Sequence, residues 1–424
     1  MNCHIKSATI IDPGSPFHLQ QKDILIQNGI IKSIGHALKT PSGTQVLEAS
    51  GAFVSTGWID TYANLGDPGF EQKENIVSGL KAAAAGGFTR VCVMPVTQPV
   101  IQTKGQLSYV LSRAEGQLCS LLPLGAITVN HAGKELAELY DMQEAGAVAF
   151  SDGPHPVQHA GLMLRALQYA TRGRALLYAH ADEDQLSPGA QMHEGEMAVR
   201  LGMKGFPAMA EELLIIRDLY LAEYTGAPIH FPTISTRGAV NLIREAKKKG
   251  IDVSCGVNPV NLLLDETALS AFDENLKLNP PLRTPDDVQA LREGIADGTI
   301  DMVCSAHQPQ NIELKAVEYE YASFGMINLQ TCFSIACTAL HGMVDATRLV
   351  EILQAAPARR LGLKETGIRE EMPANLTVFS TTQDFVFTRE GNYSISANTS
   401  FFGKPLKGRV LAVFHNNQQF IASI

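Results

Sequence analysis

The stretch Phe53-Val54-Ser55-Thr56-Gly57-Trp58-Ile59 is an apolar run that ends at a polar segment beginning with Asp60. A helix-like pattern follows over residues 73–85, and residues 89–94 form the next apolar run. A short strand, a helix and a second short strand make the unit that joins two parallel strands through a right-handed crossover. The central part of the chain therefore begins with a strand–helix–strand unit of an α/β fold.

The same alternation continues to about residue 361. The apolar runs are residues 53–59, 89–94, 121–127, 147–151, 175–180, 228–231, 251–255 and 300–305. The helix-like stretches between and after them are residues 73–85, 104–115, 134–144, 160–171, 208–224, 238–249 and 286–295. Eight strands alternating with helices predict a closed (β/α)₈ barrel of the TIM type. An open doubly wound sheet is the alternative, but no G-x-G-x-x-G follows the first strand.

The two ends of the chain have a different pattern. Residues 1–52 and residues 366–424 contain short alternating runs separated by turns rich in Gly and Asn, which is typical of β-strands. Neither end is long enough to bury a core alone. We therefore predict a small composite β-sandwich built from both ends, with the barrel domain at residues 53–365 inserted between its halves.

Composition limits the possible functions. The chain has 424 residues, 34 Lys and Arg against 43 Asp and Glu, and a net charge of −9, so nucleic acid is not an expected partner. The seven cysteines form no C-x-x-C pair, which favours a reducing compartment over a disulfide framework. The N-terminus lacks the apolar core of a signal peptide, and no run approaches the roughly 20 apolar residues of a membrane span. We expect a cytoplasmic protein that does not bind membranes.

A barrel places its reactive residues where the strands end and the loops begin. Polar segments follow most of the apolar runs. They are residues 60–69, 151–153, 180–184, 233–236, 258–261, 277–283 and 305–309. We therefore expect the functional site at the carboxyl ends of the strands.

Several of these segments resemble those of one family. They are residues 57–60 (Gly-Trp-Ile-Asp), 67–69 (Asp-Pro-Gly), 279–283 (Asn-Pro-Pro-Leu-Arg) and 297–301 (Asp-Gly-Thr-Ile-Asp), with residues 23–29 and 402–410 near the two ends. The matches run in order along the whole chain, which is thus similar to the dihydroorotases of the amidohydrolase superfamily. The resemblance implies a (β/α)₈ barrel with a composite β-sandwich, a one- or two-zinc centre, and reversible cyclisation of N-carbamoyl-aspartate to dihydroorotate in pyrimidine (UMP) biosynthesis.

The implied chemistry needs a hydroxide at neutral pH, which zinc supplies by lowering the pKa of bound water. In the family, the first strand carries D-x-H-x-H-x-R, and an aspartate after the eighth strand moves the proton. This sequence departs from that pattern at most positions. The replacements are Tyr62 and Asn64 for the two first-strand histidine ligands, Gly66 for the substrate arginine, Thr233 for the sixth-strand histidine, and Ala306 for the acid/base aspartate.

Four family positions are kept. Asp152 and His180 match metal ligands, whereas Asn279 and His307 match substrate-side positions. A catalytic zinc ion normally has three protein ligands and a water, so two ligands are too few. We therefore predict no bound cofactor and no catalytic residue in the family's sense.

Three functions remain open. The first is a non-catalytic dihydroorotase homologue with a structural or partner-binding role, for example with aspartate transcarbamoylase or an active dihydroorotase, and itself a homodimer. The alternative is an active zinc-dependent dihydroorotase or related cyclic amidase with a rearranged site that uses Asp152, His180 and either His155 or His307. The third is a small-molecule sensor that uses the old pocket, although Gly66 removes a contact to an anionic ligand.

Overall fold

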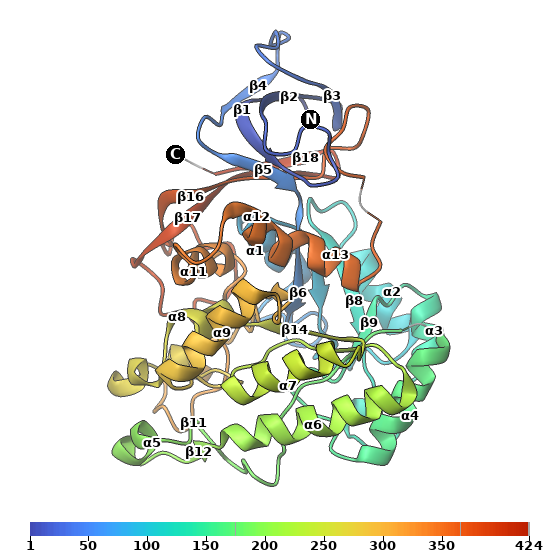
Figure 1. Ribbon diagram of the computed structural model, residues 1–424, viewed down its shortest axis with the longest axis vertical. Helices are drawn as coiled ribbons and strands as arrows, with labels where there is room; N and C mark the ends of the chain where they lie inside the picture. The colour runs from blue at the N-terminus through green and yellow to red at the C-terminus, as the bar shows by residue number, and fades with distance from the viewer. Residues whose placement is uncertain (174, 365, 423–424) are drawn as a thin grey trace.

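The computed structural model describes residues 1–173, 175–364 and 366–422. Two eight-stranded sheets organise the described residues, and a third sheet has two short strands. One large sheet forms the barrel, and the other combines segments from both ends of the chain (Figure 1). None of the helices in the described ranges combines the length and the hydropathy that a transmembrane span requires.

The barrel strands follow one another in the order of the sequence and pair in parallel. They are β6 (Trp58–Ala63), β7 (Phe88–Val93), β8 (Ser120–Gly125), β9 (Ala149–Ser151), β10 (Leu177–Tyr178), β13 (Ile229–Phe231), β14 (Val253–Val257) and β15 (Met302–Val303). A parallel bridge between Ala63 and His307 joins the first strand to the segment after the last. This bridge closes the barrel, so the predicted (β/α)₈ architecture is confirmed.

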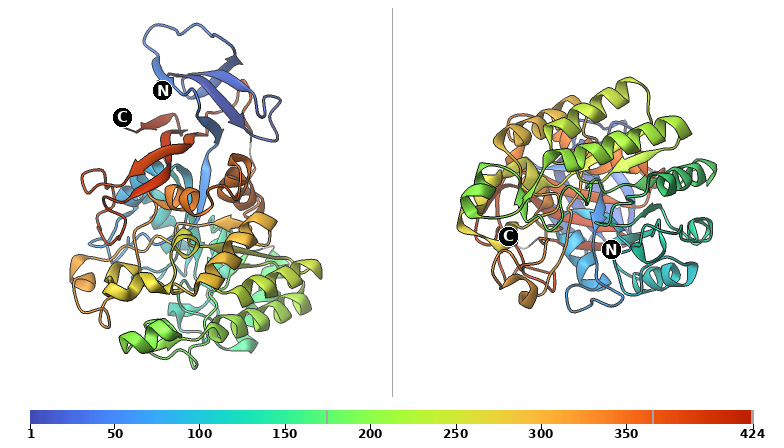
Figure 2. Two further views of the ribbon diagram at one scale, coloured as in Figure 1. Left: turned by 60° about the vertical axis from the view of Figure 1, so that its left-hand side comes forward. Right: turned by 90° about the horizontal axis from the view of Figure 1, so that it is seen from below.

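Helices surround the barrel, as the end-on view in Figure 2 shows. The seven that follow the first seven strands are α1 (Ile76–Ala85), α2 (Lys104–Arg113), α3 (Leu139–Glu144), α4 (Ala160–Gly173), α6 (Ala208–Thr225), α7 (Arg237–Lys248) and α9 (Pro285–Asp297). Local sequence sets their ends: the Asn75 side chain accepts from the Ser78 N–H at the start of α1, and Thr284 with Pro285 begins α9.

Further short elements lie in the loops and after the eighth strand. They are β11 (Met192–His193), α5 (Glu196–Leu201), β12 (Gly205–Phe206), α8 (Pro259–Leu263), α10 (Ile312–Lys315), α11 (Cys332–Ala339), α12 (Ala346–Val350) and α13 (Ala356–Arg360). A π-helical turn, Glu351–Ala355, joins the last two helices.

The second large sheet has the order β18-β17-β16-β5-β1-β2-β3, with β4 beside β1. Its strands are β1 (Cys3–Ile11), β2 (Gln21–Gln27), β3 (Ile30–Gly35), β4 (Gln45–Glu48), β5 (Phe53–Thr56), β16 (Leu376–Val386), β17 (Pro405–His415) and β18 (Gln418–Ile421). Strand β5 pairs with β1 on one side and β16 on the other, which brings the two ends of the chain into one sheet. Its core includes Ile5, Ile24, Val378 and Phe414, all fully buried.

The run at residues 53–59 was predicted as one barrel strand, and this is wrong. The chain divides at Gly57, so that β5 lies in the terminal sheet and β6 in the barrel. The Gly57 N–H donates to the Asn375 carbonyl, and a Cβ at Gly57 would lie 2.2 Å from both the Asn375 Oδ1 and the Thr89 Oγ1. Only glycine fits where the two sheets meet.

The division into domains at residues 1–52 with 366–424, and 53–365, remains a prediction. Residue 365, where its second boundary falls, lies outside the described residues, as do residues 423–424. A cluster of aromatic rings lies between the barrel and the terminal sheet. Trp58 is fully buried, and its ring centroid lies 4.7 Å from that of Phe333 and 5.0 Å from that of Phe379. These contacts fix the terminal sheet against the barrel.

Candidate functional site

The sequence-predicted site residues gather at the carboxyl ends of the barrel strands. Tyr62 lies at the end of β6, Asp152 directly follows β9, and His180 lies two residues after β10. Thr233 lies two residues after β13, and Ala306 three residues after β15. Because the strands are parallel, these positions share one end of the barrel, which we call the mouth.

Asp152 is held by the neighbouring loop. Its Oδ1 accepts from the Ile127 N–H at 2.8 Å and the Thr128 N–H at 2.9 Å, and its Oδ2 accepts from the Thr128 hydroxyl at 2.5 Å. The side chain is buried, and burial raises the pKa of Asp152 to about 6 against the opposing effect of these hydrogen bonds. The carboxylate therefore fixes the loop after β8 and has little free bonding capacity.

His180, unlike Asp152, is not held by hydrogen bonds to its side chain from the described residues. It is buried, and among the described residues no group hydrogen-bonds to either of its ring nitrogens. Burial, and then the nearby His155, lower the pKa of His180 to about 4, while the side chain of Asn279 beside it partly offsets the change. His180 is therefore a neutral imidazole at pH 7.

Asp152 and His180 come together around one small hollow, which His155, Tyr178 and Asp218 also line. Its volume is about 10 Å³, enough for roughly one water molecule, whereas a small-molecule site needs at least about 300 Å³. The mouth at this point is too small for a ring the size of dihydroorotate.

Sequence reasoning missed Asp218 as a mouth residue. It lies on the inner face of α6 and is 1% exposed, and burial raises its pKa to about 6 despite the Arg217 guanidinium 2.7 Å away. Its Oδ2 has no hydrogen-bond partner in the described part of the chain. The sequence does contain a sign of it, because Asp218 falls on the face of α6 that buries the apolar residues Leu214, Ile215 and Leu219. A carboxylate at such a position needs a partner or a function.

Apolar packing fills the positions of the missing ligands. Tyr62 is buried in a cluster with Cys92, Met94, Tyr178 and Cys304, and burial raises the pKa of its phenol well above the usual value. Ala306 packs against this cluster with a backbone φ of 46°. The barrel interior at the mouth is thus occupied by rings, thiols and a methyl group.

Thr233 is also buried at the mouth, and Asn64 is half-buried. The Asn64 N–H donates to the His307 carbonyl at 2.8 Å, so the Asn64 backbone takes part in closing the barrel. Neither residue supplies a charged ligand.

His307 is engaged away from the hollow. Its Nδ1 accepts from the Asn328 N–H at 3.1 Å and the Leu329 N–H at 3.4 Å, so the ring proton is on Nε2. That nitrogen lies 3.5 Å from the Glu74 Oε2, and both side chains are almost fully buried. Burial would raise the pKa of Glu74, but His307 and the hydroxyls of Ser394 and Ser78 together outweigh it and lower the pKa.

The segment that contains Asn279 is anchored by a buried ion pair. The Arg283 guanidinium donates to the Ser235 hydroxyl at 2.9 Å and the Phe206 carbonyl at 2.8 Å, and it lies 3.4 Å from the Glu211 carboxylate. Glu211 also accepts from the Ser235 N–H at 2.7 Å. This network ties β12 and α6 to the loop after β13 and to the segment over residues 279–283.

These residues do not fit the zinc centre that the family resemblance implies. Asp152 is bonded to the loop after β8, and His307 faces Glu74. In residues 1–173, 175–364 and 366–422, no three or more His, Cys, Asp or Glu side chains are grouped so that they could hold a metal ion. The donor set is short by at least one ligand for a single catalytic zinc.

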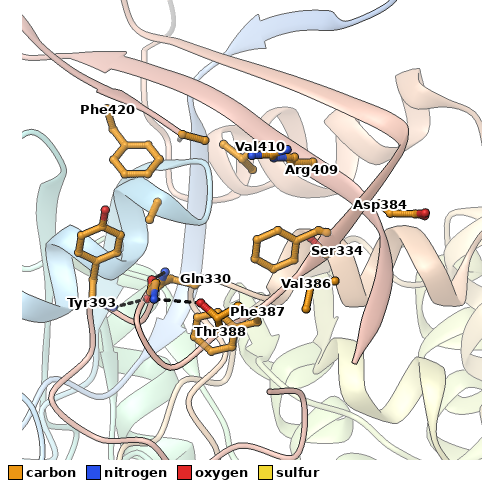
Figure 3. A pocket seen from close by; sticks show the side chains of 14 residues that line it. Gln330, Ser334, Asp384, Val386, Phe387, Thr388, Tyr393, Arg409, Val410 and Phe420 are labelled. Atoms are coloured by element: carbon orange, nitrogen blue, oxygen red, sulfur yellow. Dashed lines mark hydrogen bonds between the residues drawn. The ribbon is translucent and has the colours of Figure 1, made fainter. Parts of the chain in front are cut away.

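Larger pockets occur elsewhere. One pocket of about 380 Å³ lies beside the C-terminal strands (Figure 3). The Tyr393 and Phe420 rings line it, and their centroids are 5.9 Å apart. The Gln330 side chain stabilises the segment beside this pocket, because it accepts from the Tyr393 N–H at 2.7 Å and donates to the Gly391 carbonyl at 2.9 Å. Another, of about 590 Å³, lies beside α10 and is lined by polar side chains that include Gln310 and Asn398. Neither contains Asp152 or His180.

The closed barrel with a sheet built from both ends of the chain also occurs in solved structures. Solved structures with the same fold include the L-hydantoinase (dihydropyrimidinase) from Arthrobacter aurescens, with a TM-score of 0.85 and 20% identity over 100% of this chain and 98% of that chain. A dihydropyrimidinase from Brevibacillus agri has a TM-score of 0.82 and 22% identity over 99% of this chain and 95% of that chain. At these identities the likeness concerns the fold.

Sequence relatives define the family more closely. A family model described as dihydro-orotase-like matches residues 51–239. A dihydroorotase from Pelotomaculum thermopropionicum is 42% identical over 410 residues, or 96% of both chains, and one from Pelobacter propionicus is 38% identical over 97% of both. The chain belongs to the dihydroorotase family.

Proposed function

We propose that this chain is a non-catalytic member of the dihydroorotase family that acts in pyrimidine biosynthesis through a structural or partner-binding role. The observation that carries the proposal is the mouth, where two surviving ligand positions surround a hollow of about 10 Å³. A cyclic amide does not enter such a space, and the two remaining groups do not complete a hydrolytic site.

The chemistry of the individual side chains agrees with this proposal. The acid/base position holds Ala306, and loss of such a carboxylate costs about 10²–10⁴-fold in rate. His180 is neutral and can accept a proton, but the nearest carboxylates are bonded to Thr128 and to Arg217. Ala306 has no group that could supply the proton for a leaving amide nitrogen.

The retained fold supports a role in assembly. The chain aligns with its dihydroorotase relatives over 96–97% of their length and buries a full barrel core, while the chemical groups at the mouth are replaced. This combination is expected when the surface of the protein, rather than turnover, is its contribution. We propose aspartate transcarbamoylase, or an active dihydroorotase, as the partner.

Two linked measurements test the proposal. The purified chain, incubated with excess zinc and desalted, is expected to retain far less than one zinc ion per chain. The same chain, mixed with aspartate transcarbamoylase from the same organism, is expected to sediment as a larger complex. Near-stoichiometric zinc together with no complex would contradict the proposal.

One observation favours the alternative of an active cyclic amidase. Among the described residues, neither ring nitrogen of His180 has a hydrogen-bond partner, and His180 lines a small hollow together with Asp152 and His155. His307 does not serve this alternative because Glu74 and the 328–329 backbone engage its ring. Dihydroorotate hydrolysis that disappears in His155→Ala, but not in His307→Ala, would establish the alternative.

A further inference from the structure

The pocket of about 590 Å³ beside α10 has the size of a small-molecule site, for which roughly 300–1,000 Å³ is usual. Its walls come mainly from the segments over residues 274–275, 310–315 and 389–399. None of the described residues that line it also lines the hollow that contains Asp152 and His180. The pocket is therefore separate from the residual ligand positions at the mouth.

Part of the wall is held in place by its own hydrogen bonds. The Asn398 side chain is buried and donates to the Gln308 and Gly325 carbonyls, at 3.1 Å in each case. Its Oδ1 accepts from the Gln310 N–H, also at 3.1 Å. These bonds join the C-terminal segment to the segment over residues 308–325, so the pocket does not have to be assembled when a ligand arrives. A preorganised site loses less free energy on binding than a mobile one.

Two side chains in this wall have an oxygen atom without a partner. Gln310 is 7% exposed, and its amide nitrogen donates to the Phe324 carbonyl at 2.9 Å, which identifies its other terminal atom as the oxygen. The Asn311 amide nitrogen likewise donates to the Glu313 carboxylate at 2.6 Å. The Gln310 Oε1 and the Asn311 Oδ1 are buried, and neither accepts a hydrogen bond from the described residues. Buried acceptors are normally paired, so this part of the pocket suits a ligand with N–H donors.

The C-terminal segment supplies a positive charge to the same pocket. The Arg389 guanidinium lies over the Phe402 ring, 4.9 Å from the ring centroid. Within the described part of the chain it makes no hydrogen bond or ion pair. A guanidinium stacked on a ring keeps the N–H groups at its edge free, and their planar fork matches the two oxygens of a carboxylate. This part of the pocket therefore suits a ligand carboxylate.

We infer that this pocket binds a small zwitterion, an amino acid or a short peptide with free ends. Its ammonium end meets the oxygens of residues 310–313, and its carboxylate end meets Arg389. The charges that line the pocket favour this class over a simple ion. A lone anion would meet the Glu274 and Glu313 carboxylates, and a lone cation would meet Arg389. The Lys315 ammonium in the wall offers no donor to a ligand, because three carbonyl groups already accept from it.

Saturation-transfer NMR titrations of the full chain with glycine and with triglycine test the inference. At least one of the two is expected to bind at millimolar concentration, and which of them binds more tightly distinguishes a free amino acid from a peptide. N-acetylation removes the ammonium of the tighter probe, and amidation removes its carboxylate. Each blocked probe is expected to bind about fivefold to tenfold more weakly, because it loses a charge-assisted hydrogen bond. Absence of binding by both free probes would overturn the inference, as would equal binding of the free and blocked forms.

Variants of exposed side chains test which end of the ligand lies where. Arg389→Gln is expected to bind the free probe only as tightly as the wild type binds the amide, and to show no further loss with the amide itself. Glu313→Gln is expected to narrow the difference between the free and N-acetylated probes in the same way. Arg165→Gln is the matched control, because Arg165 is exposed on α4 outside the pocket, and it is expected to bind every probe as the wild type does. An amide that loses as much affinity for Arg389→Gln as for the wild type would place the carboxylate elsewhere and overturn the inference. This inference does not depend on the proposed function.

Discussion

Ala306 departs from the family's sequence pattern and has a strained backbone. It occupies the family's acid/base position and has a φ of 46°, in the left-handed region that a Cβ makes unfavourable by about 1–2 kcal/mol. Aspartate and asparagine adopt this conformation more readily than alanine. The backbone shape of the mouth is therefore one that an aspartate would tolerate, although the residue present is an alanine.

This strain leads to a prediction for Ala306→Gly. Relief of the Cβ clash outweighs the greater backbone entropy of glycine in the unfolded chain, so the free energy of unfolding is expected to rise by about 0.5 kcal/mol. Urea denaturation measures the change. Ala132→Gly is the control, because Ala132 has an ordinary φ of −83° and its replacement is expected to give no gain. Equal effects at the two sites would show that the backbone at 306 is unstrained.

His180 makes a pH-dependent contribution to stability. Burial lowers its pKa to about 4, below the value of about 6.5 in the unfolded chain, so below pH 6.5 the unfolded chain binds more protons. The contribution is therefore present at pH 7.5 and is lost as the pH falls toward 4. Relative to His180→Gln, the wild type is expected to lose about 2 kcal/mol of unfolding free energy between pH 7.5 and pH 5.

Urea unfolding of both proteins at the two pH values measures this difference. The buried carboxylates occur in both proteins, so their effects cancel in the comparison. The exposed His341 provides the control variant His341→Gln, which is expected to follow the wild type. A constant difference between wild type and His180→Gln across the pH range would mean that the His180 ring charges freely in the folded protein.

At the scale of the elements, buried lysines hold the segment over residues 308–325 in place. The Lys315 ammonium donates to the Ser323 carbonyl at 2.8 Å, to the Gly325 carbonyl at 3.2 Å and to the Glu274 carbonyl. The Lys277 ammonium donates to the carbonyls of residues 319 and 320 at 2.8 and 2.9 Å. Burial lowers the pKa of each ammonium to about 8. These hydrogen bonds tie residues 315–325 to the segment over residues 274–277.

Lys315→Met is expected to release this segment. The substitution removes the ammonium donor from three carbonyl groups, of which Glu274 keeps the Lys277 N–H and Gly325 keeps the Asn398 side chain. The Ser323 carbonyl loses its ammonium partner, at a cost of about 1–3 kcal/mol for a buried unsatisfied group. Hydrogen–deuterium exchange is expected to rise several-fold in residues 308–325 and to stay unchanged in the barrel strands. The exposed Lys404→Met serves as the control. Equal exchange in both variants would show that Lys315 does not restrain the segment.

Periodicity predicted the regular elements well, because each barrel strand is a buried apolar run and each long helix has one buried face. It failed where an element depends on distant partners. Gly57 divides the first run because Asn375 and Thr89 crowd it, and neither neighbour is visible in the local pattern. The two-residue strands β11 and β12 were also missed, because they carry too few residues to show alternation.

At the scale of the whole molecule, the sequence identified which mouth positions had changed but not where the surviving side chains point. The pairing of His307 with Glu74 joins residues more than 200 positions apart, and Ser394 completes it from the far end of the chain. Asp218 reaches the mouth from helix α6, which comes about 30 residues after Tyr178 and Ala179 of the same hollow in the sequence. Such contacts arise from the closed barrel, so only the three-dimensional arrangement shows which side chains line the hollow at the mouth.

The most direct test of the account is the rate of dihydroorotate hydrolysis at high enzyme concentration with zinc added. We predict a rate indistinguishable from the buffer control, and the same result for Asp152→Ala and His180→Ala, because a hollow of about 10 Å³ is too small for the substrate. Hydrolysis that rises in proportion to enzyme and disappears in Asp152→Ala would contradict it and would show that the mouth still works as an active site.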